Sequence, residues 1–251
     1  MALVSIVMPS FNSSAYIGSA IESVIAQSFQ DWELLIVDDA SADGTADWVR
    51  ERYSHDERIL VHALATNRGA AVARNVAIKA AKGRFIAFLD SDDLWLPNKL
   101  AVQVPVLETT DACLVYSNYD VFKETNRDVI RTVKVPKRLV YRDLLWGNPI
   151  GCLTAMYDTK KTGKVLMPDI RMRQDWSLWL RLLRDHRRGI GIQQSLAMLR
   201  LHDKSLSANK LRATYFNYKL LRTEGGLNPA RAAFAVGTHF LGALGRRIRI
   251  S

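Results

Sequence analysis

Three short apolar segments in the first hundred residues end abruptly in polar side chains. They span residues 3–8, 34–37 and 85–89, and each is followed within four residues by serine, asparagine or aspartate. Strands that are apolar along their whole length are typical of a parallel sheet covered by helices on both faces. Helical patterns lie between these segments, over residues 17–25, 43–52 and 70–82. The alternation predicts a doubly wound, mostly parallel α/β fold.

The second half of the chain is less regular. Strand patterns cover residues 113–122, 129–135, 151–157 and 195–201, and a helix with an apolar face is predicted over 175–184. Two further helical patterns follow, over 209–224 and 229–247. No repeat or flexible linker divides the sequence. We therefore expect one domain over residues 1–208, built from halves 1–105 and 106–208, followed by a helical tail over 209–251.

Composition narrows the class of protein. Two cysteines, Cys113 and Cys152, are too few for a disulfide framework or a zinc site, which favours a reducing cytosol. The first apolar segment stops at Pro9 and predicts a strand, not a signal peptide. Of the net charge of +10, the segment from Arg200 onward supplies +8, with ten basic and two acidic residues. Basicity therefore belongs to the tail.

Carboxylates follow two of the predicted parallel strands at the point where each strand ends. Asp38 and Asp39 follow the second apolar segment, and Asp90, Asp92 and Asp93 follow the third. In open α/β sheets, ligands bind in the crevice outside these strand ends. Aspartates gathered there repel one another unless a cation binds, and Mg²⁺ or Mn²⁺ holding a diphosphate meets that need. The pattern predicts a site for a metal-bound diphosphate.

Four motifs in order resemble one enzyme family. They are SIVMPSFN at 5–12, VDDASADGT at 37–45, the stretch from NRG to RN at 67–75, and FLDSDD at 88–93. Together they are similar to the family 2 glycosyltransferases, inverting enzymes of the GT-A fold that use nucleotide-sugars. The resemblance covers residues 3–202. It implies that residues 1–105 bind the nucleotide and residues 106–208 bind the acceptor.

The resemblance assigns the nucleotide-binding residues. It places Asp39 on the N3–H of uracil and Arg74 beside the base. Pro9 and Phe11 are expected to line the base pocket. These assignments imply a UDP-sugar donor.

The resemblance also assigns the metal and diphosphate residues. Asp90 and Ser91 are placed at the nucleotide, with Asp90 facing the ribose or a metal-bound water. Asp92 is expected to bind the Mn²⁺ or Mg²⁺ ion directly. His202 is expected to meet the metal or the diphosphate.

Three further aspartates are expected to have structural roles. Asp93 is interpreted as the cap of a short helix beginning at Leu94. Asp38 and Asp43 are interpreted as capping or turn residues. None of the three is expected to touch the ligand.

The catalytic base is predicted at Asp175. The segment RQDWSLWL at 173–180 is similar to the family's acidic pair before an aromatic helix, in which the aspartate is the base. Gln174 stands where the first acid usually lies, so Asp175 is the only carboxylate of the pair. A second interpretation is that Asp175 caps the following helix, which would stabilise its charge and oppose a base's raised pKa.

The resemblance implies transfer of a sugar to a hydroxyl of a saccharide or lipid-linked saccharide, in bacterial surface-polysaccharide synthesis of the teichuronic acid type. An Asp-x-Asp phosphohydrolase is one alternative, although the motifs around Asp39 and Arg74 would then have no role. A basic nucleic-acid-binding protein is another. The charge lies in the tail and no basic-aromatic recognition motif is present, so nucleic acid is not an expected partner.

The tail contains an uncharged stretch at 232–245, followed by Arg246, Arg247 and Arg249. Fourteen residues are too few to cross a bilayer, which needs about 20. One interpretation is an interfacial helix on an anionic membrane, which would place a cytoplasmic protein at the inner face of the cell membrane. The other is a helix packed on protein with its arginines in water.

Overall fold

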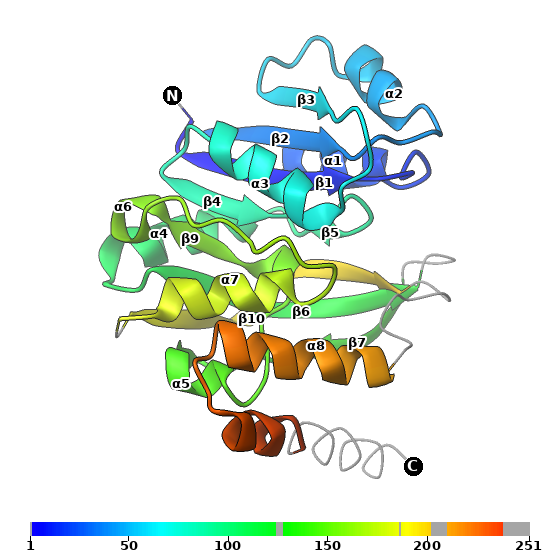
Figure 1. Cartoon of the computed structure of the whole chain (residues 1–251). Helices are drawn as coiled ribbons and strands as arrows, with labels where there is room; N and C mark the ends of the chain where they lie inside the picture. The colour runs from blue at the N-terminus through cyan, green and yellow to red at the C-terminus, as the bar shows by residue number, and fades with distance from the viewer. Residues whose placement is uncertain (1, 124–127, 186, 202–209, 238–251) are drawn as a thin grey trace.

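The computed structural model describes residues 2–123, 128–185, 187–201 and 210–237. Over these residues, a large twisted sheet is covered by helices on both faces (Figure 1). The strands follow the order β3-β2-β1-β4-β9-β6-β10-β5, with β7 added to β6 and β8 added to β10. The predicted mixed α/β architecture is confirmed. His202 and the end of the tail lie outside the described residues.

The first half contains the predicted doubly wound unit. Its four strands are all parallel, because each crossover carries a helix back across the sheet. The strands and helices are β1 (Val4–Ser10), α1 (Ile17–Ile25), β2 (Trp32–Asp38), α2 (Thr45–Arg52), β3 (Ile59–Ala63), α3 (Ala70–Ala80) and β4 (Phe85–Phe88). Every residue of β1, β2 and β4 is buried, as the apolar segments predicted.

Beyond β4 the sheet is mixed, so the expectation of a mostly parallel sheet applies only to the first half. Two pairs formed by β9 are antiparallel, whereas β6 and β10 run parallel. The strands are β5 (Leu94–Trp95), β6 (Leu114–Lys123), β7 (Val129–Val133), β8 (Arg138–Val140), β9 (Met156–Asp158) and β10 (Arg188–Leu201). The strand predicted over 151–157 is instead a 3₁₀ turn, η1 (Cys152–Thr154), followed by the three residues of β9.

The helices of the second half pack around these strands. They are α4 (Lys99–Thr109), α5 (Tyr141–Leu144), α6 (Thr159–Thr162), α7 (Gln174–Leu183) and α8 (Lys210–Thr223), and residues 229–237 are also helical. The aromatic helix predicted from Asp175 is α7. The sequence analysis missed α4, which contains Pro105, a residue that normally ends or kinks a helix. Its buried residues Leu100, Val104 and Leu107 hold it against the sheet. No helix of the described residues is long and apolar enough to span a membrane.

Two apolar cores lie on the two faces of the sheet. Alternation along β1 sends Ile6 and Met8 to one core and Val7 to the other. The face with Val7 also holds α3 and α7, and there Trp179 packs edge-on against Phe88 with ring centroids 5.7 Å apart. These cores fix the strand ends that carry the predicted site.

A lysine lies inside the second core. Lys99 is fully buried on α4, and its ammonium donates to Gln103 Oε1 and to the carbonyl oxygen of Thr154, the latter at 3.3 Å. The ring of Trp95 lies 4.4 Å from the Nζ atom. Burial lowers the pKa of Lys99 to about 7. This lysine links α4 to the segment that leads into β9.

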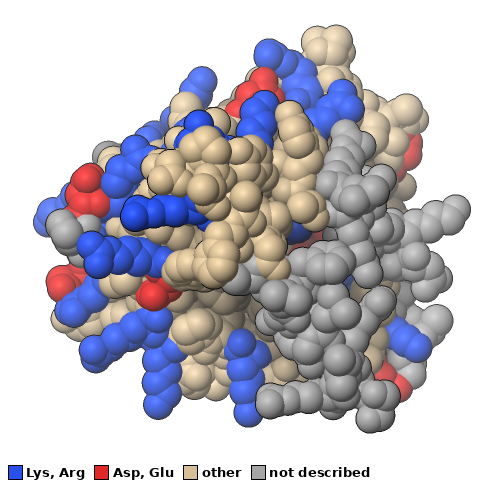
Figure 2. All heavy atoms as spheres, turned by 60° about the horizontal axis from the view of Figure 1, so that its bottom comes forward, with Lys and Arg blue, Asp and Glu red and all other residues tan. Residues whose placement is uncertain are grey.

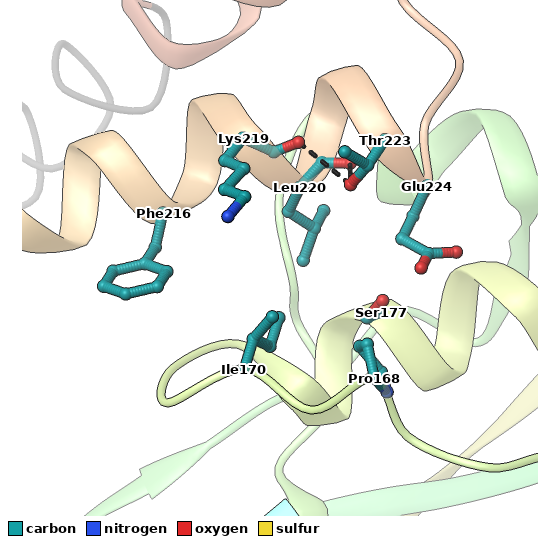
Figure 3. Close-up of a pocket in the computed structure, with 8 residues that line it drawn as sticks. All are labelled: Pro168, Ile170, Ser177, Phe216, Lys219, Leu220, Thr223 and Glu224. Atoms are coloured by element: carbon teal, nitrogen blue, oxygen red, sulfur yellow. Dashed lines mark hydrogen bonds between the residues drawn. The ribbon is translucent and has the colours of Figure 1, made fainter.

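A pocket separates α7 from α8, as Figure 3 shows. Its cavity volume is about 30 Å³, far below that of small-molecule sites. Ser177 lies at its floor, and Glu224 lies above it, bonded to Arg181 of α7. The Arg181–Glu224 pair joins the two helices beside this gap, so we interpret the pocket as a gap in helix packing.

Candidate active site

The loops after β1 and β2 are joined by hydrogen bonds from small polar side chains. The Asp38 carboxylate accepts from the Ser41 amide at 2.9 Å and from the Ser41 hydroxyl at 2.5 Å. Asn12, whose φ is 48°, accepts from the Ala42 amide on the neighbouring loop at 2.9 Å. Asp38 therefore shapes its own turn, and its interpretation as a turn residue is confirmed.

Asp43 also has a structural role. Its carboxylate accepts from the Ser14 amide at 3.0 Å and from the Thr45 amide at 3.1 Å. Burial acts to raise the pKa of Asp43, but hydrogen bonds from Thr45 and Ser14 outweigh it and lower the pKa to about 2. The carboxylate thus stays charged and connects the loop after β1 to the start of α2.

Asp39 fixes the loop that leads into α3. Its Oδ1 accepts from the Arg68 amide and its Oδ2 from the Gly69 amide, both at 2.7 Å. Gly69 has a φ of 90°, a conformation that favours glycine. Each carboxylate oxygen can accept more than one hydrogen bond, so Asp39 retains acceptor capacity for a ligand donor. The sequence analysis did not predict this clamp on residues 68–69.

Arg74 and Asp90 form an ion pair between α3 and the end of β4. The Arg74 Nη2 donates to Asp90 Oδ1 at 2.5 Å, and the Arg74 side chain is 8% exposed against 33% for Asp90. The buried Nε of Arg74 has no hydrogen-bond partner among the described residues. A buried N–H without a partner is costly, and a bound ligand is one way to satisfy it. Arg74 was expected beside the base, and its observed partner is the first aspartate of the Asp-x-Asp motif.

The interpretation of Asp93 as a helix cap is wrong. The residues after it form β5, and its carboxylate accepts from the Arg200 amide on β10 at 2.8 Å. Burial, together with the charges of Asp92 and Asp90, raises the pKa of Asp93 well above its ordinary value. The short strand pairs with β10 across the sheet, a long-range contact that local patterning could not reveal.

Arg200 secures the Asp-x-Asp turn. Its Nε donates to the carbonyl oxygen of Asp92 at 2.7 Å, and its guanidinium lies 4.9 Å from the ring centroids of both Tyr16 and Phe122. The sequence analysis counted Arg200 only as part of the basic tail. Arg200 lies 107 residues after Asp93, so no local feature of the sequence indicates that the two residues are hydrogen-bonded.

Asp175 lies in the first turn of α7, and Arg173 occupies the N-cap position. This geometry argues against the interpretation of Asp175 as an N-cap. The side-chain amide of Asn148 donates to Asp175 Oδ2 at 2.9 Å. Burial raises the pKa of Asp175, the nearby charges of Arg74 and Arg173 lower it, and that of Asp90 raises it, with a net increase. An elevated pKa suits a carboxylate that must accept a proton.

Residues from both halves of the chain therefore meet at one place. Burial raises the pKa of the Cys152 thiol, and the charges of Arg74, Asp90 and Asp175 all act on it. Cys152, in η1, is thus close to charged groups of α3, of the turn after β4 and of α7. The sequence analysis brought Arg74, Asp90 and Asp175 to one site but missed Cys152 and Asn148, which have no motif of their own.

The remaining predicted residues lie around this centre. Pro9 is buried within β1, whereas Phe11, the first residue after the carboxyl end of β1, is 51% exposed. Ser91 is buried, and Asp92 is partly exposed. His202 lies outside the described residues, so its predicted role stays a prediction.

The fit of the site to a divalent metal rests on its oxygen donors. Asp90, Asp92 and Asp93 stand within four residues, and one of them is already neutralised by Arg74. Mg²⁺ and Mn²⁺ bind through one or two carboxylates together with phosphate oxygens, so Asp92 with Asp90 fits such an ion. The described residues contain no group of three His, Cys, Asp or Glu side chains able to hold a metal unaided. A cation here would need the ligand's own oxygens.

A parallel first half, an Asp-x-Asp turn after β4 and a buried aspartate from the second half are the arrangement expected of a GT-A transferase. The family model of glycosyl transferase family 2 matches residues 5–164. The chain belongs to this family, and it is a glycosyltransferase. The phosphohydrolase alternative is thereby set aside.

Two relatives are similar to this chain over more than four-fifths of their own length. One is the "Putative teichuronic acid biosynthesis glycosyltransferase TuaG" of Bacillus subtilis, 41% identical over 220 residues that cover 86% of this chain and 87% of the relative. The other is the UDP-Glc:alpha-D-GlcNAc-diphosphoundecaprenol beta-1,3-glucosyltransferase WfgD of Escherichia coli, 37% identical over 84% of this chain and 81% of the relative.

A solved structure shares the fold. S. aureus TarS 1–349 in complex with UDP-GlcNAc superposes with a TM-score of 0.72 over 96% of this chain and 73% of its own, at 22% identity. At that identity the likeness supports the fold alone. The predicted GT-A architecture is confirmed.

Proposed function

We propose that this chain transfers a sugar from a nucleotide-sugar, with a UDP-sugar favoured, to a saccharide hydroxyl during synthesis of a bacterial surface polysaccharide. The observation that carries the proposal is the meeting of the Arg74–Asp90 pair with Asp175 at one edge of the sheet. The names of TuaG and WfgD support the process and the donor class.

The nucleotide would bind at the ends of β1 and β2. Asp39 would accept the N3–H of uracil while it continues to hold the Arg68 and Gly69 amides. Phe11 offers an exposed ring beside the buried Pro9, and the free Nε–H of Arg74 offers a donor to the nucleotide. This arrangement supports the assignment of residues 1–105 as the nucleotide-binding half.

Asp175 would be the base. An inverting transfer needs a group that removes the proton of the acceptor hydroxyl as the nucleoside diphosphate leaves from the opposite face of the sugar. The raised pKa of Asp175 favours this task, and the side-chain amide of Asn148 holds the carboxylate in place through Oδ2. Residues 106–208 would then position the acceptor.

Asp92, aided by Asp90, would hold Mn²⁺ or Mg²⁺, and His202 would add to that shell. Such an ion neutralises the negative charge that develops on a leaving diphosphate. Arg74 balances the charge of Asp90 within the site, and Asp92 is partly exposed in the same turn. The WfgD name describes a lipid-linked acceptor, which supports a lipid-linked saccharide as the acceptor here. Use of such an acceptor would place a cytoplasmic protein at the inner face of the membrane.

The test is a donor screen that measures the nucleoside diphosphate released from UDP-, GDP- and dTDP-sugars, with and without Mn²⁺ or Mg²⁺. We expect release with a UDP-sugar, its loss in Asp92→Asn and Asp175→Asn, and little change in the control Asp47→Asn, an exposed aspartate on α2. Thermal stabilisation by UDP should be larger with Mn²⁺ than without it. Release that survives in Asp175→Asn at the wild-type rate would remove this base from the mechanism.

A further inference from the structure

Two large aromatic side chains stand exposed side by side on the second half of the chain. Trp146, just after α5, is 55% exposed, and Phe234, in the helix over residues 229–237, is 66% exposed. Their rings meet edge to face with centroids 6.2 Å apart. Scattered exposed apolar residues are normal, but two paired rings at the rim of a groove suggest a contact surface.

The groove beside the rings is lined by apolar side chains together with two arginines. Its lining residues are Arg142, Leu145, Trp146, Leu227, Arg231, Phe234 and Ala235. A second groove shares Arg142 and adds the exposed Arg184, with Asp185 as the acidic member. Figure 2 shows this end of the molecule, where Lys and Arg side chains are spread around an uncharged area and acidic side chains are fewer. We call Arg142, Trp146, Arg231 and Phe234 the aromatic-basic surface.

The aromatic-basic surface is connected to the proposed base by a short stretch of chain. The carbonyl of Leu144 accepts from the indole of Trp176 at 2.9 Å, and Asn148 donates to Asp175 at the same distance. Trp146 lies between these two anchors. Within the stretch 144–148, Leu144 and Asn148 therefore contact α7, whereas Trp146 is exposed on the aromatic-basic surface.

We propose that the aromatic-basic surface docks the protein on an anionic phospholipid bilayer. Tryptophan rings favour the boundary between headgroups and acyl chains, and arginine side chains bind headgroup phosphates. The surface is not the basic run at 246–249 of the sequence, because Arg142 and Trp146 belong to the half over residues 106–208. Its use in presenting a lipid-linked acceptor rests on the proposed function, whereas membrane binding itself does not.

Charge favours a lipid surface over a second copy of this chain. A twofold contact would bring the same patch together with itself, so the arginines of one copy would lie close to those of the other. Like charges facing each other at an interface are unfavourable. An anionic bilayer offers the opposite charge together with an apolar interior for the two rings.

The test is co-sedimentation of the full chain with phosphatidylcholine vesicles that contain phosphatidylglycerol, and with phosphatidylcholine alone. We expect binding to the anionic vesicles, and a loss of at least tenfold in affinity for both Trp146→Ala/Phe234→Ala and Arg142→Glu/Arg231→Glu. The matched controls are Leu60→Ala, an exposed apolar residue on β3, and Lys82→Glu, an exposed cation after α3. Both controls should bind as the wild type does.

Two further measurements keep the result interpretable. The thermal midpoint and the stabilisation by UDP should be unchanged in both double variants, because their altered side chains are exposed and lie outside residues 1–105. The vesicles carry no acceptor and the readout needs no turnover, so failure of the sugar-transfer proposal would not affect this test. Wild-type binding by both double variants would overturn the proposal, and so would a dimer that Trp146→Ala dissociates.

Discussion

Replacement of the buried Lys99 by Met is predicted to stabilise the protein, most strongly at pH 7 and below. The lysine has hydrogen bonds to Gln103 and Thr154, but no carboxylate partners it among the contacts of the described residues. Burial lowers its pKa from 10.5 to about 7, so the folded state releases a proton that the unfolded chain keeps. Met has a similar length and no charge to desolvate.

The size of the effect follows from that pKa. A fall from 10.5 to about 7 corresponds to about 5 kcal/mol of unfavourable free energy at pH 7. Loss of the hydrogen bond to Gln103 Oε1 reduces this gain in stability by about 1–2 kcal/mol, while Gln103 Nε2 keeps its 2.8 Å bond to the Thr154 carbonyl. We expect Lys99→Met to be more stable than the wild type by about 3 kcal/mol at pH 7, allowing for both effects.

The sign of the pH dependence is fixed by proton binding. Between pH 7 and 10 the unfolded chain holds one more proton at Lys99 than the folded chain, so wild-type stability rises with pH in this window. The advantage of the variant should therefore shrink by about 1.4 kcal/mol per pH unit on going from pH 7 to pH 9.

The assay is urea unfolding followed by circular dichroism at pH 7 and pH 9, with Lys79→Met on the exposed end of α3 as the control. Taking the difference between variant and wild type cancels other groups that titrate in the same range. A variant that is less stable at pH 7, with a difference that does not change with pH, would refute the desolvation reasoning.

Two other predictions concern the site. Asn148→Ala removes a hydrogen-bond donor to the Asp175 carboxylate, so the pKa of Asp175 should rise further. The acid limb of the kcat/KM profile should then move to higher pH, and kcat/KM on that limb should fall about tenfold. A uniform loss of kcat/KM at all pH values would contradict a role through Asp175. Arg74→Met should cost about 2 kcal/mol in urea unfolding, less than a fully buried pair because Asp90 is one-third exposed. The exposed pair of Arg50 with Asp47 supplies the control Arg50→Met, for which a loss comparable to that of Arg74→Met would argue against burial as the cause.

The sequence predicted the first half well because its signals are local. A strand that is apolar throughout and ends at Asp38 or Asp90 has one stable arrangement when helices alternate with it, and parallel strands bring those ends to one edge. The order of the motifs along the chain added Asp175 to the predicted site, whereas the helical pattern alone could not distinguish a catalytic base from a helix cap at this position. The placement of Arg74 at Asp90 confirms that α3 faces the Asp-x-Asp turn.

What the sequence did not predict depends on contacts distant along the chain. Asp93 accepts from Arg200 only because β5 pairs with β10, and the helix α4 forms around Pro105 because its apolar face is buried. Asn148 lies in the irregular segment between α5 and η1, and Cys152 is the first residue of η1, so neither belongs to a periodic pattern. Such residues can be assigned only once the tertiary fold is known.

The account is tested most directly by the anomeric configuration of the product. Proton NMR of the saccharide formed from an α-linked UDP-sugar should show a β linkage with the wild type and no product with Asp175→Asn. An α linkage, or a β-linked product formed by Asp175→Asn at the wild-type rate, would contradict a single-displacement transfer with Asp175 as its base.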